Sequence, residues 1–508
     1  MSTAKRLISG TIASWARIGV TIVTQLILVP VFLTYWDIKT YGMWLTIQAL
    51  VSVVSTFDKG YVDYLGFEFL KQGRENVEKI TNYLWSGVVV LLAIGTVELL
   101  LLWISIPYFL TYTISSNSNL SQDTIRQGTV ALICQWFVWV YFSNTTGLFF
   151  RALSAWGYFS RMAWWDVTIA FLSSIVSILI VTQGGDLFAL SIGNLIFLAI
   201  INILRCYDIS VILEKENMLK GRISIDLGLQ TYKDSILLSV RYLLENFKQQ
   251  GLRLILTPLI GVEGLTSFST TKTGTSFMQQ GILTITNPML PELMRFLNKK
   301  EQDKLDATFG TVWVIIVTIL GPGMLFFQIS AHTLFDIWTK GKIPFEPFLI
   351  ATLLSSILIY SFSQPAIAIV TGNNLIKNQM LISILSTLTL IGLIFFIVPN
   401  FGLNGVGISI LISEFLAGFC FIIFAKKWLR ANNLCWPTQL SYIVFLSVIS
   451  TIICMLSVCF RILETWVILI FYVTVSILLM ISYWSYTSIF IKNKLLRVFK
   501  KTSLNINS

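Results

Sequence analysis

The sequence predicts an all-α, polytopic membrane protein with about 14 transmembrane helices. Three observations predict this class. Of the 508 residues, 55% are hydrophobic and only 12% are charged, whereas soluble domains carry about 25% charged residues. Apolar runs long enough to cross a bilayer, which takes roughly 20 residues, recur along the whole chain. Lysine and arginine are also distributed very unevenly between alternate connecting segments, as the two sides of a membrane require.

Fourteen apolar runs are the expected spans. Lys5 and Arg6 precede the first run, which is too long for the apolar region of a signal peptide, so we interpret it as a transmembrane helix rather than a cleaved leader. Turn-forming residues separate most of the runs, for example Gly184–Asp186, Gly341–Pro344 and Pro399–Gly402. The expected spans are 11–35, 42–69, 81–111, 126–150, 162–181, 187–204, 235–260, 265–289, 306–330, 348–371, 378–398, 404–425, 438–460 and 465–490.

The connecting segments indicate the orientation of these spans. With the N-terminus placed in the cytoplasm, the cytoplasmic segments hold 25 Lys and Arg residues and the outer loops hold 5. Cytoplasmic loops carry an excess of positive charge, and Trp and Tyr gather at the ends of spans, as they do here at Trp164–Trp165 and Tyr483–Trp484. The pattern predicts an even number of spans and both termini in the cytoplasm.

The cysteines and the single histidine point away from metal and triad chemistry. The six cysteines form no CxxC pair and most lie in apolar runs, and His332 is the only histidine. A transition-metal site or a histidine-based catalytic triad is therefore not expected. We expect no cofactor, no metal and no catalytic residue, and no nucleic acid as a partner.

A repeated pattern divides the chain. Residues Leu26–Val31 and Leu254–Leu259 are both apolar runs around a proline, and the prolines lie 228 residues apart. Gly184 and Gly402 open similar short turns near the outer ends of two later spans. Six spans return the chain to the same side, so the two halves would have the same orientation, as in transporters built from parallel repeats. We expect a six-helix lobe at 1–216, a second at 217–430, and two further helices with a basic cytoplasmic tail at 431–508.

Six basic residues remain within the spans after the loops are counted. A Lys or Arg near the centre of a helix costs about 2.5–3.5 kcal/mol on insertion scales, so such residues face a wet cavity or partner groups. All six lie on the first two spans of each expected half, where they would line a central cavity suited to an anionic group. These candidate substrate-binding residues are Arg17, Lys59, Arg241, Lys248, Arg253 and Lys272.

Structural roles compete with this interpretation. Arg17 and Arg241 could extend to the membrane interface. Three carboxylates are candidates for coupling or for ion pairs: Asp58, Asp63 and Glu245. Asp63 lies one helical turn from Lys59, and Glu245 shares a helical face with both Arg241 and Lys248, so either carboxylate could neutralise a base. Two other acidic residues, Glu98 and Glu414, lie on other spans, where we expect packing roles with hydrogen-bonded partners.

Several short motifs resemble one family. They are Val29–Leu33, which ends the first span, the Tyr-Gly-x-Trp turn Tyr41–Trp44, the Asp-x-Gly element in Phe57–Gly60, and the glycine-rich turn Pro399–Gly407. In their order and spacing they resemble polysaccharide-repeat-unit flippases of the multidrug/oligosaccharidyl-lipid/polysaccharide exporter superfamily. The resemblance covers essentially the whole chain, with twelve core helices in two bundles and two more at the C-terminus.

The resemblance implies a function. Such proteins move oligosaccharides linked to undecaprenyl pyrophosphate across the bacterial cytoplasmic (inner) membrane, for O-antigen of lipopolysaccharide or for capsule, by alternating access of two lobes. It also implies a polysaccharide polymerase and a chain-length regulator as partners, and we expect the chain to act as a monomer. Because the family is very divergent in sequence, the roles of its residues cannot be transferred to positions of this chain outside the motifs.

Three alternatives remain open at the level of the sequence. A flippase for another lipid-linked cell-wall precursor would share the fold and the charge pattern. A multidrug exporter of the same superfamily would favour an acidic cavity for cationic drugs. A membrane polysaccharide polymerase would need a substantial outer loop, and the longest one, 331–347, is short, although it holds His332, Asp336, Lys340 and Lys342.

Overall fold

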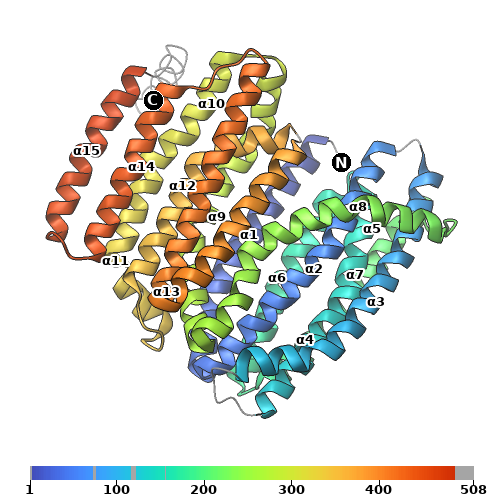
Figure 1. Cartoon of the computed structure of the whole chain (residues 1–508). Helices are drawn as coiled ribbons and strands as arrows, with labels where there is room; N and C mark the ends of the chain where they lie inside the picture. Colours follow the sequence, from blue (N-terminus) through green and yellow to red (C-terminus); the bar gives the residue numbers. More distant parts are fainter. Residues whose placement is uncertain (1–2, 73–75, 116–121, 155, 374, 487–508) are drawn as a thin grey trace, which may run out of the picture. The chain divides into compact units, whose positions relative to one another are not determined.

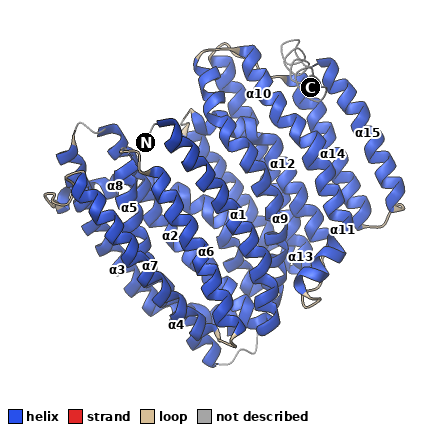
Figure 2. Ribbon diagram, turned by 180° about the vertical axis from the view of Figure 1, so that it is seen from behind, coloured by secondary structure: helices blue, strands red, loops and turns tan. Residues whose placement is uncertain are grey.

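The computed structural model describes residues 3–72, 76–115, 122–154, 156–373 and 375–486, and within these ranges every regular element is a helix (Figures 1 and 2). Three short π-helical turns, η1 (Trp139–Asn144), η2 (Phe247–Gly251) and η3 (Ile316–Leu320), interrupt α-helices. The all-α class is confirmed. The expected basic tail at 487–508 lies outside the described residues.

Within the described residues each expected span falls on a helical stretch, but several helices extend well beyond their span; the helix that begins at Leu187, for example, continues to Lys215, past the expected end at 204. Their bounds are α1 (Thr3–Tyr35), α2 (Ile38–Gln72), α3 (Val77–Ser115), α4 (Gln122–Val138), α5 (Thr145–Ser154), α6 (Phe159–Thr182), α7 (Leu187–Lys215), α8 (Ile225–Asn246), α9 (Leu252–Asn298), α10 (Gln302–Ile315), α11 (Gly321–Thr339), α12 (Pro347–Gly372), α13 (Ile376–Ala431), α14 (Thr438–Cys459) and α15 (Thr465–Tyr486). The two longest helices each contain a kink, at Gly261 in α9 and at Gly402 in α13, where φ is 73° and 53°. These kinks separate consecutive expected spans, and glycine adopts such positive φ values without a steric penalty.

Ten stretches of the described chain are long and apolar enough to cross a membrane. Two of them, Ile225–Leu283 and Ile376–Ala431, each hold two consecutive expected spans. The remaining two expected spans are α2 and the α4–α5 segment, which are less apolar. Helix α2 carries Asp58, Lys59 and Asp63 in its middle, and these charges lower its hydropathy. The chain is therefore a multi-pass membrane protein.

The chain packs as two compact units. The first comprises Met1–Thr270 together with Ile337–Pro344, and the second comprises Thr271–Asp336 and Phe345–Ser508. This division describes which residues pack together, whereas the expected boundary at 216/217 concerns the repeat and stays a prediction.

Close helix contacts in the first unit explain the Tyr-Gly-x-Trp motif. A Cβ on Gly42 would lie 2.4 Å from Thr266 Oγ1 and 2.9 Å from the carbonyl oxygen of Val262. Thr266 Oγ1 also donates a hydrogen bond to the carbonyl of Ile38. Only glycine therefore allows the start of α2 to lie against the turn of α9 that follows the Gly261 kink. The aromatic residues of the motif and of the end of α1 pack on one another, with Phe32 stacked on Tyr41 at 5.5 Å.

The α6–α7 turn is held by two side chains. Gly184 has φ 83°, and Asp186 caps α7 by accepting a hydrogen bond from the amide of Ala189 at 2.8 Å. The indole of Trp36, at the end of α1, donates to the carbonyl of Gly185 at 2.9 Å. The turn predicted from Gly184–Asp186 is therefore present and is tied to the α1–α2 turn.

Proline 30 leaves a carbonyl of α1 without its helical donor. Because proline has no N–H, the carbonyl of Leu26 loses the hydrogen bond that residue 30 would supply. Trp338 Nε1 donates to this carbonyl at 3.0 Å. In the same segment, Lys340 Nζ contacts Thr34 Oγ1 at 2.7 Å and Lys342 Nζ contacts the carbonyl of Leu33. Segment 337–344 thus supplies an indole donor and two cations to the C-terminal part of α1, where the helix dipole favours positive charge.

Replacing Trp338 with phenylalanine should loosen α1 around Pro30. The ring packing is largely kept, but the carbonyl of Leu26 loses its donor, which costs about 1 kcal/mol. Hydrogen exchange of the amides at 31–35 should accelerate in the purified protein. The effect should shrink in a Pro30→Ala background, because an alanine N–H there can bond to Leu26. Equal acceleration in both backgrounds would contradict this account.

The second unit is built around α12, which is buried along most of its length. Its core contains an aromatic cluster in which Trp313 stacks on Phe362 at 6.0 Å and meets Trp436 at 5.7 Å. A Cβ on Gly407 would lie 2.1 Å from Thr352 Oγ1, so α12 and α13 cross closely at a glycine. Helices α14 and α15 belong to this unit, and Tyr483 of α15 donates to the carbonyl of Gly310 in α10 at 2.8 Å.

Candidate functional site

A group of charged side chains surrounds Tyr242 in the first unit. The Lys59 ammonium lies 5.6 Å from the centroid of the Tyr242 ring, and the Arg241 guanidinium lies 5.9 Å from it. The Tyr242 hydroxyl hydrogen-bonds to the carboxylate of Asp63. We call the following set the Tyr242 cluster: Lys59 and Asp63 of α2, Arg151 of α5, and Arg241, Tyr242 and Glu245 of α8.

Two glycines of α2 bring these helices together. A Cβ on Gly60 would lie 2.2 Å from Ser239 Oγ and 2.5 Å from its Cα, so α2 and α8 cross at nearly backbone contact. A Cβ on Gly66 would lie 3.2 Å from Cδ of Arg151, which places the stem of that arginine against α2. Asn246 Nδ2, at the end of α8, donates to the carbonyl of Ser52. The Asp-x-Gly element thus brings Lys59 beside Tyr242 because its glycine has no side chain.

The pairing of charges in the cluster is specific. Arg151 Nη2 donates to Asp63 Oδ1 at 2.5 Å, and Arg241 Nε donates to Glu245 Oε1 at 3.1 Å. Asp63 therefore pairs with an arginine of another helix, and not with Lys59 one turn away as the sequence allowed. The cluster holds three cations and two carboxylates, so it keeps a surplus of positive charge. Such a surplus, next to a phenol donor, suits an oxyanion.

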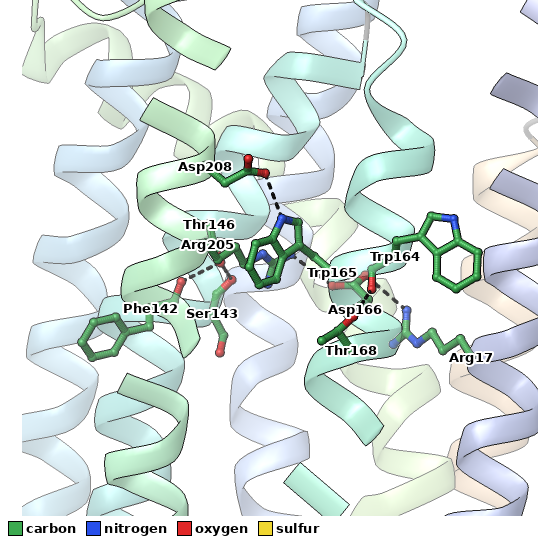
Figure 3. Close-up of polar contacts among 10 residues, drawn as sticks. All are labelled: Arg17, Phe142, Ser143, Thr146, Trp164, Trp165, Asp166, Thr168, Arg205 and Asp208. Atoms are coloured by element: carbon green, nitrogen blue, oxygen red, sulfur yellow. Dashed lines mark hydrogen bonds and ion pairs between the residues drawn. The ribbon is translucent and has the colours of Figure 1, made fainter. Parts of the chain in front are cut away.

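Arg17 belongs to a different network, on α1, α6 and α7 (Figure 3). Its Nη1 lies 3.6 Å from Asp166 Oδ2, and Arg205 Nη2 lies 3.1 Å from Asp166 Oδ1. The Arg205 side chain is only 8% exposed, and its guanidinium lies 4.6 Å from the centroid of the Phe150 ring. Arg17 itself is 62% exposed. One carboxylate thus joins three helices by holding two arginines.

The other three candidate bases follow Tyr242 in the chain, on η2 and α9. Lys248 is on the π-helical turn η2, which directly follows α8, and it is half-buried. Arg253 lies beside Tyr41, and its Nε is buried with no hydrogen-bond partner among the described residues. Lys272 belongs to the second unit, in a stretch of α9 rich in serine and threonine. Within the first unit, the structure therefore gathers Lys59 and Arg241 around one ring, and Arg17 and Arg253 have other neighbours.

Asp58 faces a separate group. Its Oδ2 accepts a hydrogen bond from Trp139 Nε1 of η1 at 3.1 Å, and the side chain is buried. Glu98 of α3 is close enough to interact electrostatically with Asp58. Its Oε2 is buried without a hydrogen-bond partner among the described residues, so the expected bonded packing role is not seen at that atom. The two carboxyl groups form an acidic pair within the first unit.

Three residues of these networks escaped the sequence analysis. Arg151 and Arg205 were counted in cytoplasmic loops, but α5 and α7 continue past them and both arginines bond to carboxylates of other helices. Tyr242 was not predicted as a site residue because no sequence motif includes it. The adjacent Arg241 could have indicated it. An aromatic ring next to an intramembrane base can bind a cation through its face, so Tyr242 was a candidate contact for a second base.

Fold and site together define a polytopic α-helical membrane protein with charged clusters inside its helix bundles. Comparison with protein-family models finds no match, and comparison with curated proteins finds none either. Among solved structures, the chain has the fold of MATE transporters of the MOP superfamily. A MATE transporter in complex with MaL6 is 13% identical with a TM-score of 0.58, over 84% of this chain and 97% of that chain.

Two further structures extend this likeness. A mutant of the Vibrio cholerae MATE transporter VcmN is 12% identical, with a TM-score of 0.57, over 84% of this chain and 97% of that one. A MOP superfamily transporter from Pyrococcus furiosus is 14% identical, with a TM-score of 0.57, over 84% of this chain and 96% of that one. The latter is described as having a binding pocket of reversed polarity that suggests a different function. At these identities the likeness establishes the fold.

Proposed function

We propose that this protein is a flippase that moves oligosaccharides linked to undecaprenyl pyrophosphate across the bacterial cytoplasmic membrane by alternating access. The observation that carries the proposal is the Tyr242 cluster, where Lys59 and Arg241 flank one ring on helices that cross at Gly60. Charged residues within membrane helices are costly, so a surplus of cations there indicates an anionic ligand.

The chemistry of the substrate fits such a cluster. A pyrophosphate presents several anionic oxygens, and an acidic sugar presents a carboxylate. Lysine acts as a point charge toward either group, whereas arginine donates in a planar fork. We assign substrate binding to Lys59 and Arg241, with Lys248 on the adjoining turn. Arg17, Arg253 and Lys272 are assigned to further contacts along the path of the substrate.

The proposal also includes the substrate class, the partner proteins and the orientation in the membrane. The substrate would be a repeat unit of O-antigen or capsule, and a polysaccharide polymerase and a chain-length regulator would act with the flippase. The protein would work as a monomer with both termini in the cytoplasm. It performs no chemical step on the sugar in this proposal. Two charged residues of the 331–347 loop, Lys340 and Lys342, bond to α1.

Export of cationic compounds is the second candidate. It is favoured by the buried carboxyl of Asp58 with Glu98 beside it in the first unit, and by the likeness of the fold to MATE transporters. The two candidates require opposite charges on the transported molecule. The two candidate functions can therefore be distinguished by testing one anionic and one cationic substrate in the same vesicles.

Reconstituted vesicles provide the test. The wild-type protein should move an undecaprenyl-pyrophosphate-linked oligosaccharide from one leaflet to the other, and the triple variant Lys59→Gln/Arg241→Gln/Lys248→Gln should lose at least about tenfold in rate, since each tenfold corresponds to about 1.4 kcal/mol. Asp58→Asn should matter less for this substrate than the triple variant. If ethidium is transported and the lipid-linked oligosaccharide is not, with loss of ethidium transport in Asp58→Asn, the exporter function replaces the flippase.

A further inference from the structure

The carboxylate of Asp63 is surrounded by donors of the kind that bind an anionic ligand. Its carboxylate accepts from Arg151 Nη2 at 2.5 Å and from the Tyr242 hydroxyl. A guanidinium and a phenol that converge on one pair of oxygens are the donors expected around a bound phosphate or carboxylate. The protein's own side chain therefore presents the chemistry of the proposed substrate to the donors of the cluster.

The two partners of this ion pair differ in exposure. The Arg151 side chain is 46% exposed, whereas that of Asp63 is 10% exposed. An anion that approaches from outside the cluster therefore meets the guanidinium before it meets the carboxylate. An arginine side chain is long enough to turn toward such an anion while its stem stays against Gly66.

Asp63 also has a second donor. If Arg151 turns away, the carboxylate keeps the hydrogen bond from the Tyr242 hydroxyl, so it is not left without a donor. Glu245 stays with Arg241 at 3.1 Å through its own helix and takes no part in this exchange. The exchange thus takes place on the Arg151 guanidinium, between Asp63 and the incoming anion.

We propose that Asp63 is the resident counter-ion of Arg151, and that the anionic group of the substrate takes its place on that guanidinium. This inference rests on the proposed function for the identity of the substrate. It assigns Arg151 to the binding site and makes Asp63 a residue that sets affinity by competition. A site of this kind binds its substrate more weakly than its cations alone would, which favours release.

The test is binding of inorganic pyrophosphate to the purified full-length protein, measured by titration calorimetry. Asp63→Asn keeps the shape of the side chain and removes the competitor, so the affinity should rise about tenfold. Asp63→Ser, which still offers an oxygen to Tyr242, should also raise it. Arg151→Gln should lower the affinity and should abolish the gain when combined with Asp63→Asn.

A matched control lies in the same unit. Asp208 of α7 pairs with Arg161 of α6, outside the Tyr242 cluster, and Asp208→Asn should leave pyrophosphate affinity unchanged. Repeating the titrations with glucuronate distinguishes an acidic sugar from a pyrophosphate, because the anion whose affinity responds to Asp63→Asn is the one that Arg151 takes.

The outcomes separate this inference from the flippase proposal. If the wild type transports the lipid-linked oligosaccharide but Asp63→Asn and Asp63→Ser bind both anions no more tightly, the counter-ion inference is overturned and the flippase remains. If binding follows the expected order but no lipid-linked oligosaccharide is moved, the anion site stands and the proposed substrate is wrong. If neither anion binds any form of the protein, the counter-ion inference also fails.

Discussion

Replacing Gly60 with valine should destabilise the protein and abolish its transport activity. A side chain at this position would meet Ser239 Oγ at 2.2 Å and the backbone of Ser239 at 2.5–2.7 Å, so α2 and α8 must move apart. Overpacking of this kind costs about 1–3 kcal/mol, and valine lies at the upper end because it adds two further methyl groups. The displacement would separate Lys59 from the Tyr242 ring, so transport should fall even where the protein still folds.

Thermal unfolding and vesicle transport together check this prediction. Gly60→Ala should show the same changes at smaller size. Gly147→Ala is the matched control, because a Cβ there meets nothing within 4 Å and alanine favours a helix by up to about 1 kcal/mol over glycine. Gly147→Ala should therefore be neutral or stabilising. Wild-type unfolding and transport in Gly60→Val would show that α2 and α8 do not depend on this crossing.

Replacing Asp166 with asparagine should have the second large effect. Arg205 is 8% exposed and depends on Asp166 for its ion pair, so its charge would be left buried without a counter-ion. Removing one partner of a buried ion pair costs about 3–5 kcal/mol, and the partial exposure of Asp166 places the expected loss near 3 kcal/mol. The unfolding temperature of the purified protein should fall markedly, and Arg17 should lose its link to α6 (Figure 3).

Two variants discriminate the cause. In Asp166→Leu/Arg205→Leu no buried charge remains, so most of the stability should return, as it does when buried ion pairs are replaced by apolar residues. Asp208→Asn removes the carboxylate that pairs with Arg161, whose side chain is 52% exposed, and should cost about 1 kcal/mol or less. If Asp166→Asn is no more harmful than Asp208→Asn, burial of Arg205 is not the controlling feature.

The helices were predictable because the signal for a membrane span is local. Each expected span coincides with a helical stretch, and glycines in two of the predicted connections, Gly184 and Gly402, adopt positive φ. A run of apolar residues must satisfy its own backbone hydrogen bonds in lipid, and a helix does this without any distant partner. The fold class therefore follows from composition and spacing, before any tertiary contact is known.

The charged networks were only partly predictable. The sequence identified Lys59 and Arg241 as bases that need partners, and it placed both on helices of the expected cavity. It allowed Asp63 to pair with Lys59 because those two residues lie one turn apart, whereas the structure pairs Asp63 with Arg151, 88 residues away. The sequence also placed Arg205 in a loop, because a base that follows an apolar run is typical of the end of a membrane span. Spacing along one helix says nothing about a partner on another.

The sequence by itself thus determined that the chain is a multi-pass helical membrane protein, which stretches of it are helical, and which charged residues are unusual in that setting. Only the tertiary structure decided which of these residues meet. The rotation of α2 against α8 is set by the contact of Gly60 with Ser239, and this rotation brings Lys59 to Tyr242. Ion pairs between helices depend on such rotations, and these depend on packing along whole helix faces, which no local pattern encodes.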